Sequence, residues 1–204
     1  RLCHASSVKA MLEMIGTGGI TNQVEDVANA EVMVVIGANP PVNHPVAATF
    51  MKNAAHNGKT LILIDPRRTE LAPHADHVLQ FQPDTDVALL NSIMAAVLEQ
   101  GLADETFIRE HTTGFEALKE HLAGYSPDRT APITGVPADT VREVARIYAG
   151  SRGSMIFWGM GISQHSHGTD NARSLIDLAL ISGQIGRPGT GLHPLRGQNN
   201  VQGA

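Results

Sequence analysis

A cysteine and a histidine stand together near the start of this chain, and an arginine stands near its end. Cys3 is the only cysteine among the 204 residues, and His4 follows it directly. A thiolate is a soft metal ligand, and an imidazole can exchange a proton near neutral pH. Arg196 carries a planar guanidinium that can bind a carboxylate or a phosphate through two parallel hydrogen bonds. If the fold brings these residues together, one pocket holds a metal ligand, a proton-transfer group and an anion-binding group.

Each of these residues also has a simpler interpretation. A lone cysteine is often an inert core residue, and a histidine beside it is often structural. Arg196 could bridge loop carbonyls without any ligand. His165 and His167 form a His-x-His pair that could ligate a metal. On a loop with no second pair, however, solvated or hydrogen-bonded side chains are the better expectation.

Three apolar runs, over residues 32–36, 61–64 and 155–158, predict buried strands with functional residues at their ends. They are followed by Gly37 and Asn39, by Asp65 and Arg67, and by a Gly-Met-Gly turn around Met160, respectively. Ligands of an open parallel sheet bind at the carboxyl ends of its strands. Glycine allows phosphates to approach the backbone, a carboxylate accepts from a ribose hydroxyl or a guanine edge, and arginine binds phosphate. These ends resemble a nucleotide site, although each alone could be an ordinary turn and the usual NAD and ATP motifs are absent.

The remaining pattern alternates between helices and strands. We expect helices over residues 8–15 with a Ser6-Ser7 cap, 45–56, 84–100, twice within 104–122, 137–148 and 169–182, and another strand over 77–81. Residues 123–136 and most of the last 22 residues are predicted to be loops because they are rich in proline or glycine. A strand, a helix and a strand over 32–64 form a βαβ unit, whose strands are parallel. The predicted fold class is α/β: a three-layer, Rossmann-like nucleotide-binding domain with a largely parallel sheet.

Composition excludes several classes of protein. The chain is 42% hydrophobic and 17% charged, with a net charge of −5, which gives no reason to expect nucleic acid as a partner. A single cysteine cannot form an internal disulfide, and no apolar run approaches the ~20 residues of a membrane span. We expect a single domain, residues 1–204, cut from a longer protein, because the chain lacks an initiator methionine. We expect a cytoplasmic protein, with a periplasmic location requiring a leader outside this segment.

Six segments taken together resemble the molybdopterin oxidoreductases, and specifically the catalytic subunits of formate dehydrogenases. They occur in family order along the whole chain, and the closing segment is the most specific. The segments are RLCHASSV (1–8), VIGANP (35–40), IDPRRTE (64–70), WGMGISQ (158–164), GQIGRPG (183–189) and HPLRGQNNVQGA (193–204).

The resemblance implies a role for each candidate residue. Cys3 matches the residue that supplies the protein ligand to molybdenum or tungsten, and His4 matches a histidine that assists proton removal. Arg196 matches the arginine that orients formate. The domain would hold one of two molybdopterin guanine dinucleotides, which form the bis-MGD cofactor. The implied cofactor contacts are Gly37, Asn39, Asp65, Arg67, Asp86, Met160, Gln164 and Gln198.

The same resemblance implies that the intact enzyme converts formate to carbon dioxide, or the reverse, and passes electrons through 4Fe-4S clusters that lie outside this segment. Its implied partners are the remaining domains of the subunit and iron–sulfur or diaphorase-type electron-transfer subunits, without direct membrane insertion. The segment alone is expected to be inactive. A nitrate reductase relative and a non-catalytic subunit of a respiratory complex are the alternatives. Cys3, His4 and Arg196 together argue against both.

Overall fold

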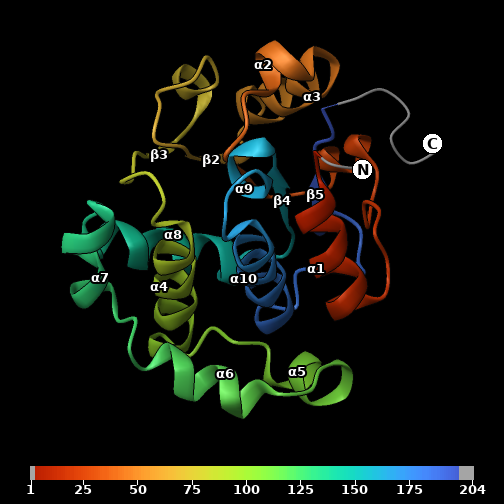
Figure 1. Ribbon diagram of the computed structural model, residues 1–204. Coiled ribbons are helices and arrows are strands. Elements are labelled where there is room, and N and C mark those ends of the chain that lie inside the picture. Colours follow the sequence, from red (N-terminus) through yellow and green to blue (C-terminus); the bar gives the residue numbers. More distant parts are fainter. Residues whose placement is uncertain (1–2, 198–204) are drawn as a thin grey trace.

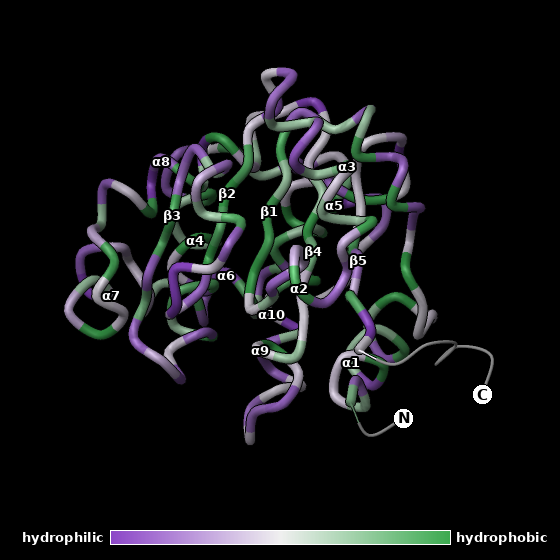
Figure 2. Tube along the Cα trace, turned by 90° about the horizontal axis from the view of Figure 1, so that it is seen from above, coloured by the Kyte–Doolittle hydropathy of each residue, from purple (hydrophilic) through white to green (hydrophobic). Residues whose placement is uncertain are grey.

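Buried apolar strands form a five-stranded sheet in the computed structural model, which describes residues 3–197. The strands are β1 (Val32–Ile36), β2 (Thr60–Ile64), β3 (His77–Leu79), β4 (Ser154–Trp158) and β5 (Gly191–Pro194). Their order across the sheet is β3-β2-β1-β4-β5, and every neighbouring pair is parallel. Figure 2 shows them side by side, with hydrophobic residues along β1, β2 and β4. The predicted α/β class with a largely parallel sheet is confirmed.

Helices cover both faces of the sheet. In chain order they are α1 (Ala5–Ile15), α2 (Pro40–Asn43), α3 (Pro45–His56), α4 (Asp86–Glu99), α5 (Glu105–His111), α6 (Phe115–Leu122), α7 (Pro127–Thr134), α8 (Ala138–Gly150), α9 (Met160–Ser163) and α10 (Gly168–Ile181), with short 3-10 helices at Val24–Ala28 and Ala72–His74. Figure 1 shows α2 and α3 on one side of the strands and α4 and α10 on the other. Within residues 3–197, no helix combines the length and the hydropathy that crossing a bilayer requires.

Alternate side chains of the central strands enter two separate cores. Val34 and Ile36 of β1 pack with α1, α4, α8 and α10, whereas Met33 and Val35 pack with α3 and the two 3-10 helices. Every residue of β1 and β4 is buried. This burial on both faces explains their continuous apolar sequence, because a parallel sheet with helices on both sides has no solvent-facing positions.

The chain changes direction across the sheet at β1. The connection through α3 leads from β1 to β2 on one side, and the long excursion through α4 to α8 returns the chain to β4 on the other side. The segments that follow β1 and β4 therefore enter helical layers on opposite faces of the sheet. Such a switch point leaves a crevice at the strand ends, where open α/β sheets bind ligands.

The start of α1 differs from the prediction. The helix begins at Ala5, so Ser6 and Ser7 lie inside its first turn and neither caps it. Ser6 Oγ donates to Ser163 O at 2.7 Å, and Ser7 Oγ lies 2.7 Å from Ser163 Oγ. The capping prediction was wrong because these hydroxyls have tertiary partners, which the local sequence does not contain.

Two further elements lie in segments predicted to be loops. The helix α7 forms within residues 123–136, since Pro127 occupies its first turn, where a missing N–H is tolerated, and Thr130 Oγ1 bonds Ser92 Oγ of α4 at 2.7 Å. The strand β5 forms within the glycine-rich end and pairs with β4 as an edge strand, where Pro194 is acceptable. In both cases packing outweighs local propensity. The short helices α2 and α9 were also not predicted, and β3 ends two residues earlier than expected.

Candidate functional site

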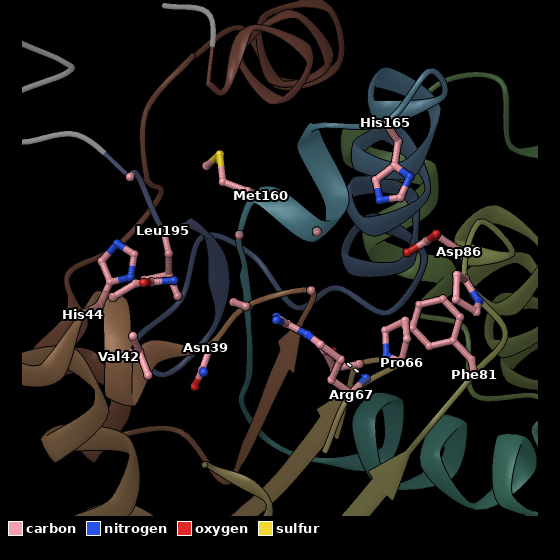
Figure 3. Close-up of a pocket in the computed structure, with 18 of the residues that line it drawn as sticks. Asn39, Val42, His44, Pro66, Arg67, Phe81, Asp86, Met160, His165 and Leu195 are labelled. Atoms are coloured by element: carbon pink, nitrogen blue, oxygen red, sulfur yellow. Dashed lines mark hydrogen bonds and ion pairs between the residues drawn. The ribbon is translucent and has the colours of Figure 1, made fainter. Parts of the chain in front are cut away.

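A cavity of about 800 Å³ opens at the carboxyl ends of the strands, at the switch point between β1 and β4. Its size lies within the usual range for small-molecule and cofactor sites. Figure 3 shows side chains from five separate parts of the chain around it. Six of the predicted cofactor residues line this cavity: Gly37, Asn39, Asp65, Arg67, Asp86 and Met160.

Close backbone contact between two glycines shapes one wall of the cavity. Gly37 ends β1 with φ +56°, and Gly161 N in α9 donates to Gly37 O at 2.9 Å. A Cβ atom added to Gly161 would lie 2.7 Å from Gly37 Cα, a distance that real side chains do not reach. The two segments can touch only because neither residue carries a side chain, which leaves backbone rather than side chains facing the cavity.

Asp65 and Arg67 form a polar pair at the end of β2. Asp65 is 3% exposed, and its Oδ1 accepts from the Arg67 backbone N–H at 2.8 Å. Burial raises the pKa of Asp65, while the Arg67 N–H and guanidinium act in the opposite direction. The Arg67 side chain is mostly exposed and extends towards the middle of the cavity (Figure 3). The pair thus presents a buried acceptor and an exposed cation to the same space.

A second group of polar residues borders the cavity beside Asp65. Asp86 is the first residue of α4 and is 4% exposed. Burial raises the pKa of Asp86, and nearby His165 opposes this rise. Figure 3 shows His165 and Asp86 on the same side of the cavity. His165 Nδ1 lies 3.6 Å from Asp84 Oδ1, so this end is rich in acceptors for N–H and O–H donors.

Asn39 leaves one acceptor unused in the cavity wall. Its Nδ2 donates to Glu70 Oε2 at 2.5 Å, which orients the amide. Its Oδ1 is buried and has no hydrogen-bond partner within residues 3–197. A buried acceptor without a partner is unfavourable, and a bound ligand with a donor would correct this. Together with the glycine wall, Arg67 and the buried carboxylates, this acceptor suits a large ligand that carries phosphates, hydroxyls and N–H groups.

The first and last parts of the described segment, residues 3–197, meet beside this cavity. His4 is 1% exposed, and its Nε2 lies 2.8 Å from Leu195 O, while its Nδ1 lies 3.0 Å from Ser163 Oγ. His44 Nε2 lies 2.5 Å from Arg196 O. Burial lowers the pKa of His4, and the nearby Arg196 charge lowers it further. Leu195 and His44 line the cavity (Figure 3). Since His4 bonds Leu195 and His44 bonds Arg196, the His4 segment and the Arg196 segment join at its edge.

Arg196 is anchored to a loop but retains an unused donor. Its Nη2 donates to Gly18 O, so the interpretation of Arg196 as a bridge to a loop carbonyl describes one of its contacts. Its Nε is buried with no partner among the described residues, and burial lowers the pKa of the guanidinium. An anion beside this edge of the guanidinium would satisfy the donor. Cys3, His4 and Arg196 themselves do not line the 800 Å³ cavity. His4 bonds Leu195 at its border, and Arg196 stands between the lining residues Leu195 and Gly197.

The two remaining predicted cofactor contacts are Gln164 and Gln198. Gln164 is exposed after α9 and is not part of the cavity lining, and Gln198 lies outside the described residues. Within residues 3–197 no three His, Cys, Asp or Glu residues are grouped as a metal site. Sequence reasoning missed His44 and Phe81 as lining residues. The place of His44 soon after the end of β1 was the only signal for it.

Comparison with known proteins identifies the family. The family model for molybdopterin oxidoreductase matches residues 1–204. The F420-dependent formate dehydrogenase subunit alpha of Methanocaldococcus jannaschii is 42% identical over 204 residues, and formate dehydrogenase H of Escherichia coli is 38% identical. The chain is covered completely in both alignments, but it spans only 30% and 28% of the length of these relatives.

A solved structure shares the fold. Acetylene hydratase from Pelobacter acetylenicus superimposes with a TM-score of 0.84 and 27% identity, over 93% of this chain and 26% of that one. The strand order, the switch-point cavity and the full-length match to the family model agree with one another. The chain belongs to the molybdopterin oxidoreductase family.

Proposed function

We propose that this chain is part of a formate dehydrogenase catalytic subunit, which oxidises formate to carbon dioxide or carries out the reverse reaction. The observation that carries this proposal is the contact between His4 and Leu195, which joins the Cys3 segment to the Arg196 segment at the border of the cavity. The similarity to formate dehydrogenases from an archaeon and a bacterium supports the choice of substrate. The fold alone does not decide it, because acetylene hydratase has a similar fold.

The cavity is proposed to hold one of the two molybdopterin guanine dinucleotides of a bis-MGD cofactor with molybdenum or tungsten. Asp65 and Asp86 would accept from its hydroxyl and N–H groups, and Arg67 would bind phosphate. Gly37, Asn39 and Met160 would complete the wall, with Gln164 and Gln198 as further contacts. When bound, the cofactor supplies the two-electron chemistry, and the protein contributes orientation and electrostatics.

The proposed substrate site lies at the Cys3 and Arg196 end. Cys3 would bind the metal through its thiolate. Arg196 would bind the formate carboxylate with its guanidinium, and its unpaired Nε is a suitable donor. His4 would assist proton removal beside the metal, for which it has to release one of its two hydrogen bonds, to Leu195 O or to Ser163 Oγ. Holding formate in one orientation can itself lower the barrier by several kcal/mol, and by up to ~7–11 kcal/mol in ideal cases.

The proposed partners lie outside this chain. Electrons would leave through 4Fe-4S clusters in other domains of the subunit and then reach iron–sulfur or diaphorase-type subunits. We place the enzyme in the cytoplasm. An F420-dependent relative indicates that the final acceptor must be determined for each enzyme.

The test uses the full-length protein, produced in cells supplied with molybdate or tungstate. We expect the purified protein to contain one of the two metals and pterin, and to reduce a dye with formate. A Cys3→Ala variant should lose nearly all of this activity while retaining its thermal unfolding midpoint, because only the metal ligand is removed. A protein without metal and pterin, or a fully active Cys3→Ala variant, contradicts the proposal.

A further inference from the structure

A continuous chain of hydrogen bonds runs from the core of the sheet to the peptide before Arg196. Trp158 Nε1 donates to Ser7 Oγ at 2.8 Å, and Ser7 Oγ lies 2.7 Å from Ser163 Oγ. Ser163 Oγ lies 3.0 Å from His4 Nδ1, and His4 Nε2 lies 2.8 Å from Leu195 O. All of these side chains are buried. These hydrogen bonds therefore connect β4, α1, α9 and the segment after β5.

The two ends of this series of hydrogen bonds limit which atoms can donate along it. An indole N–H can only donate, so Ser7 Oγ accepts from Trp158, and its own proton is free to go to Ser163 Oγ. A peptide carbonyl can only accept, so His4 must carry a proton on Nε2. Ser163 then donates to Nδ1, because its alternative acceptor, Gly159 O, is more distant at 3.4 Å. In the neutral ring, a proton on Nε2 makes Nδ1 the acceptor for the Ser163 hydroxyl.

A second imidazole binds the next carbonyl in the sequence. His44 lies at the junction of α2 and α3, on the other side of the sheet from α1. Its Nε2 lies 2.5 Å from Arg196 O, so this nitrogen must also carry a proton. His4 and His44 thus hold two consecutive carbonyls, those of Leu195 and Arg196, from different layers of the fold.

We propose that His4 and His44 form an imidazole clamp that positions the Arg196 backbone, and that Ser163 is the positioning residue that sets the orientation of His4. The consequence for formate rests on the proposed function. The Arg196 guanidinium can meet a carboxylate with the right geometry only if the Arg196 backbone is held in place. The hydrogen bonds that begin at Trp158 supply this rigidity.

The kinetic test compares paired variants of the full-length enzyme. Ser163→Ala removes a hydroxyl, and Ser163→Thr keeps one. His44→Leu removes a donor, and His44→Gln keeps an amide donor. We expect Ser163→Ala and His44→Leu to raise KM for formate about fivefold to tenfold with a smaller change in kcat, because a weakened anion site loses ground-state and transition-state binding equally. Ser163→Thr and His44→Gln should restore most of the affinity.

Ser182→Ala is the matched control for the loss of a buried serine hydroxyl. Ser182 is buried after α10, and its Oγ has no partner in the described part of the chain. Its replacement should leave KM unchanged. An unchanged KM in both Ser163→Ala and His44→Leu would overturn the clamp. His44→Leu provides this test even where Ser163→Ala fails to fold.

A spectroscopic test does not depend on formate turnover. Nitrogen NMR of the full-length protein with ¹⁵N-labelled histidine should show His4 and His44 protonated on Nε2, with the His4 Nδ1 accepting a hydrogen bond. Ser163→Ala should shift the His4 Nδ1 signal towards that of a free acceptor, and Ser163→Thr should reverse the shift. A proton on His4 Nδ1 in the neutral ring would overturn the clamp. Inactivity with formate alongside the expected spectra would refute the proposed function and support the clamp.

Discussion

At the scale of single residues, backbone groups hold three of the polar side chains of the site. The Asp65 carboxylate accepts from a backbone N–H, His4 bonds a peptide carbonyl, and Arg196 bonds the Gly18 carbonyl. This arrangement leaves the Asn39 Oδ1 and the Arg196 Nε without partners among the described residues. Unsatisfied buried groups each cost about 1–3 kcal/mol, so a ligand that pairs with them gains that free energy on binding.

The first prediction concerns the geometry of Arg196. Arg196→Lys keeps the positive charge but replaces a planar fork with a point charge, so binding through two parallel hydrogen bonds is lost. We expect kcat/KM for formate to fall about tenfold to a hundredfold, the equivalent of about 1.5–3 kcal/mol. Arg109→Lys is the control, because Arg109 is an exposed residue of α5. Equal kcat/KM values in wild type and Arg196→Lys would rule out the proposed role.

The second prediction concerns Asp177, a residue of α10 outside the proposed site. Burial raises the pKa of Asp177 from 3.8 to about 6, and Arg173 only partly opposes this. The folded state therefore binds this proton more tightly than the unfolded state. The stabilisation of the folded state by protonated Asp177 is complete below pH ~4 and is lost as the pH rises through about 6.

Asp177→Asn should remove this loss of folding stability at higher pH, since an amide carries no charge at any of these pH values. We expect the variant to match wild type near pH 4 and to be more stable at pH 7 by up to about 3 kcal/mol. Urea unfolding at several pH values measures the difference. Glu120→Gln, a change at an exposed position of α6, should show no such trend. A difference that stays constant with pH would contradict the assignment.

At the scale of elements, the sequence predicted what local patterning controls. The bounds of β1 and α3 agree with the prediction, because a continuous apolar run bounded by Gly37 and a proline-initiated helix before Gly58 are local signals. The helix α7 was missed because it depends on packing against α4 and α8. The partners of Ser6 and Ser7 were missed for the same reason, since Ser163 lies more than 150 residues away.

The third prediction tests the contact between β1 and α9. Gly161→Ala should force these segments apart, because the new Cβ would lie 2.7 Å from both Gly37 Cα and Gly37 O. We expect a loss of about 1–3 kcal/mol in stability and a lower pterin content, since the cavity wall moves. Urea unfolding and pterin analysis of the purified full-length protein provide the two measurements. Gly150→Ala is the control, because a Cβ there meets no atom within 4 Å. Identical behaviour of the two variants would show that the glycine contact is unimportant.

At the scale of the whole molecule, the site is assembled by topology. The cavity draws residues from the ends of β1, β2 and β4, from the start of α4 and from the segment after β5. The strand-end rule located the first three groups from sequence, because it needs only the order of elements. The presence of Asp86 at the site and the proximity of His4 to the Arg196 segment were implied only by the family resemblance. The strand β5, which precedes Leu195 and Arg196, was missed, because neither the strand nor the direction of its pairing can be read from a glycine-rich segment.

The last prediction separates stability from cofactor binding. Burial raises the pKa of Asp65, so its ionised form destabilises the fold at neutral pH, and a residue that is unfavourable for folding is a candidate for binding. Asp65→Asn keeps an oxygen that can accept from the Arg67 N–H but removes the charge. We expect the variant, produced without pterin, to unfold at the same or a higher temperature than wild type. Produced with pterin, it should retain less cofactor per polypeptide and gain less thermal stability from it.

Asp76→Asn is the matched control for this change. The Asp76 carboxylate also accepts one backbone N–H, that of Leu61 at 2.8 Å, but Asp76 does not line the cavity. Its replacement should therefore leave the pterin content unchanged. Full pterin retention in Asp65→Asn, or a lower unfolding temperature of its pterin-free form, would show that Asp65 serves the fold rather than the cofactor. Because one carboxylate faces the cavity and the other does not, the pair tests whether the switch point of this sheet binds the dinucleotide.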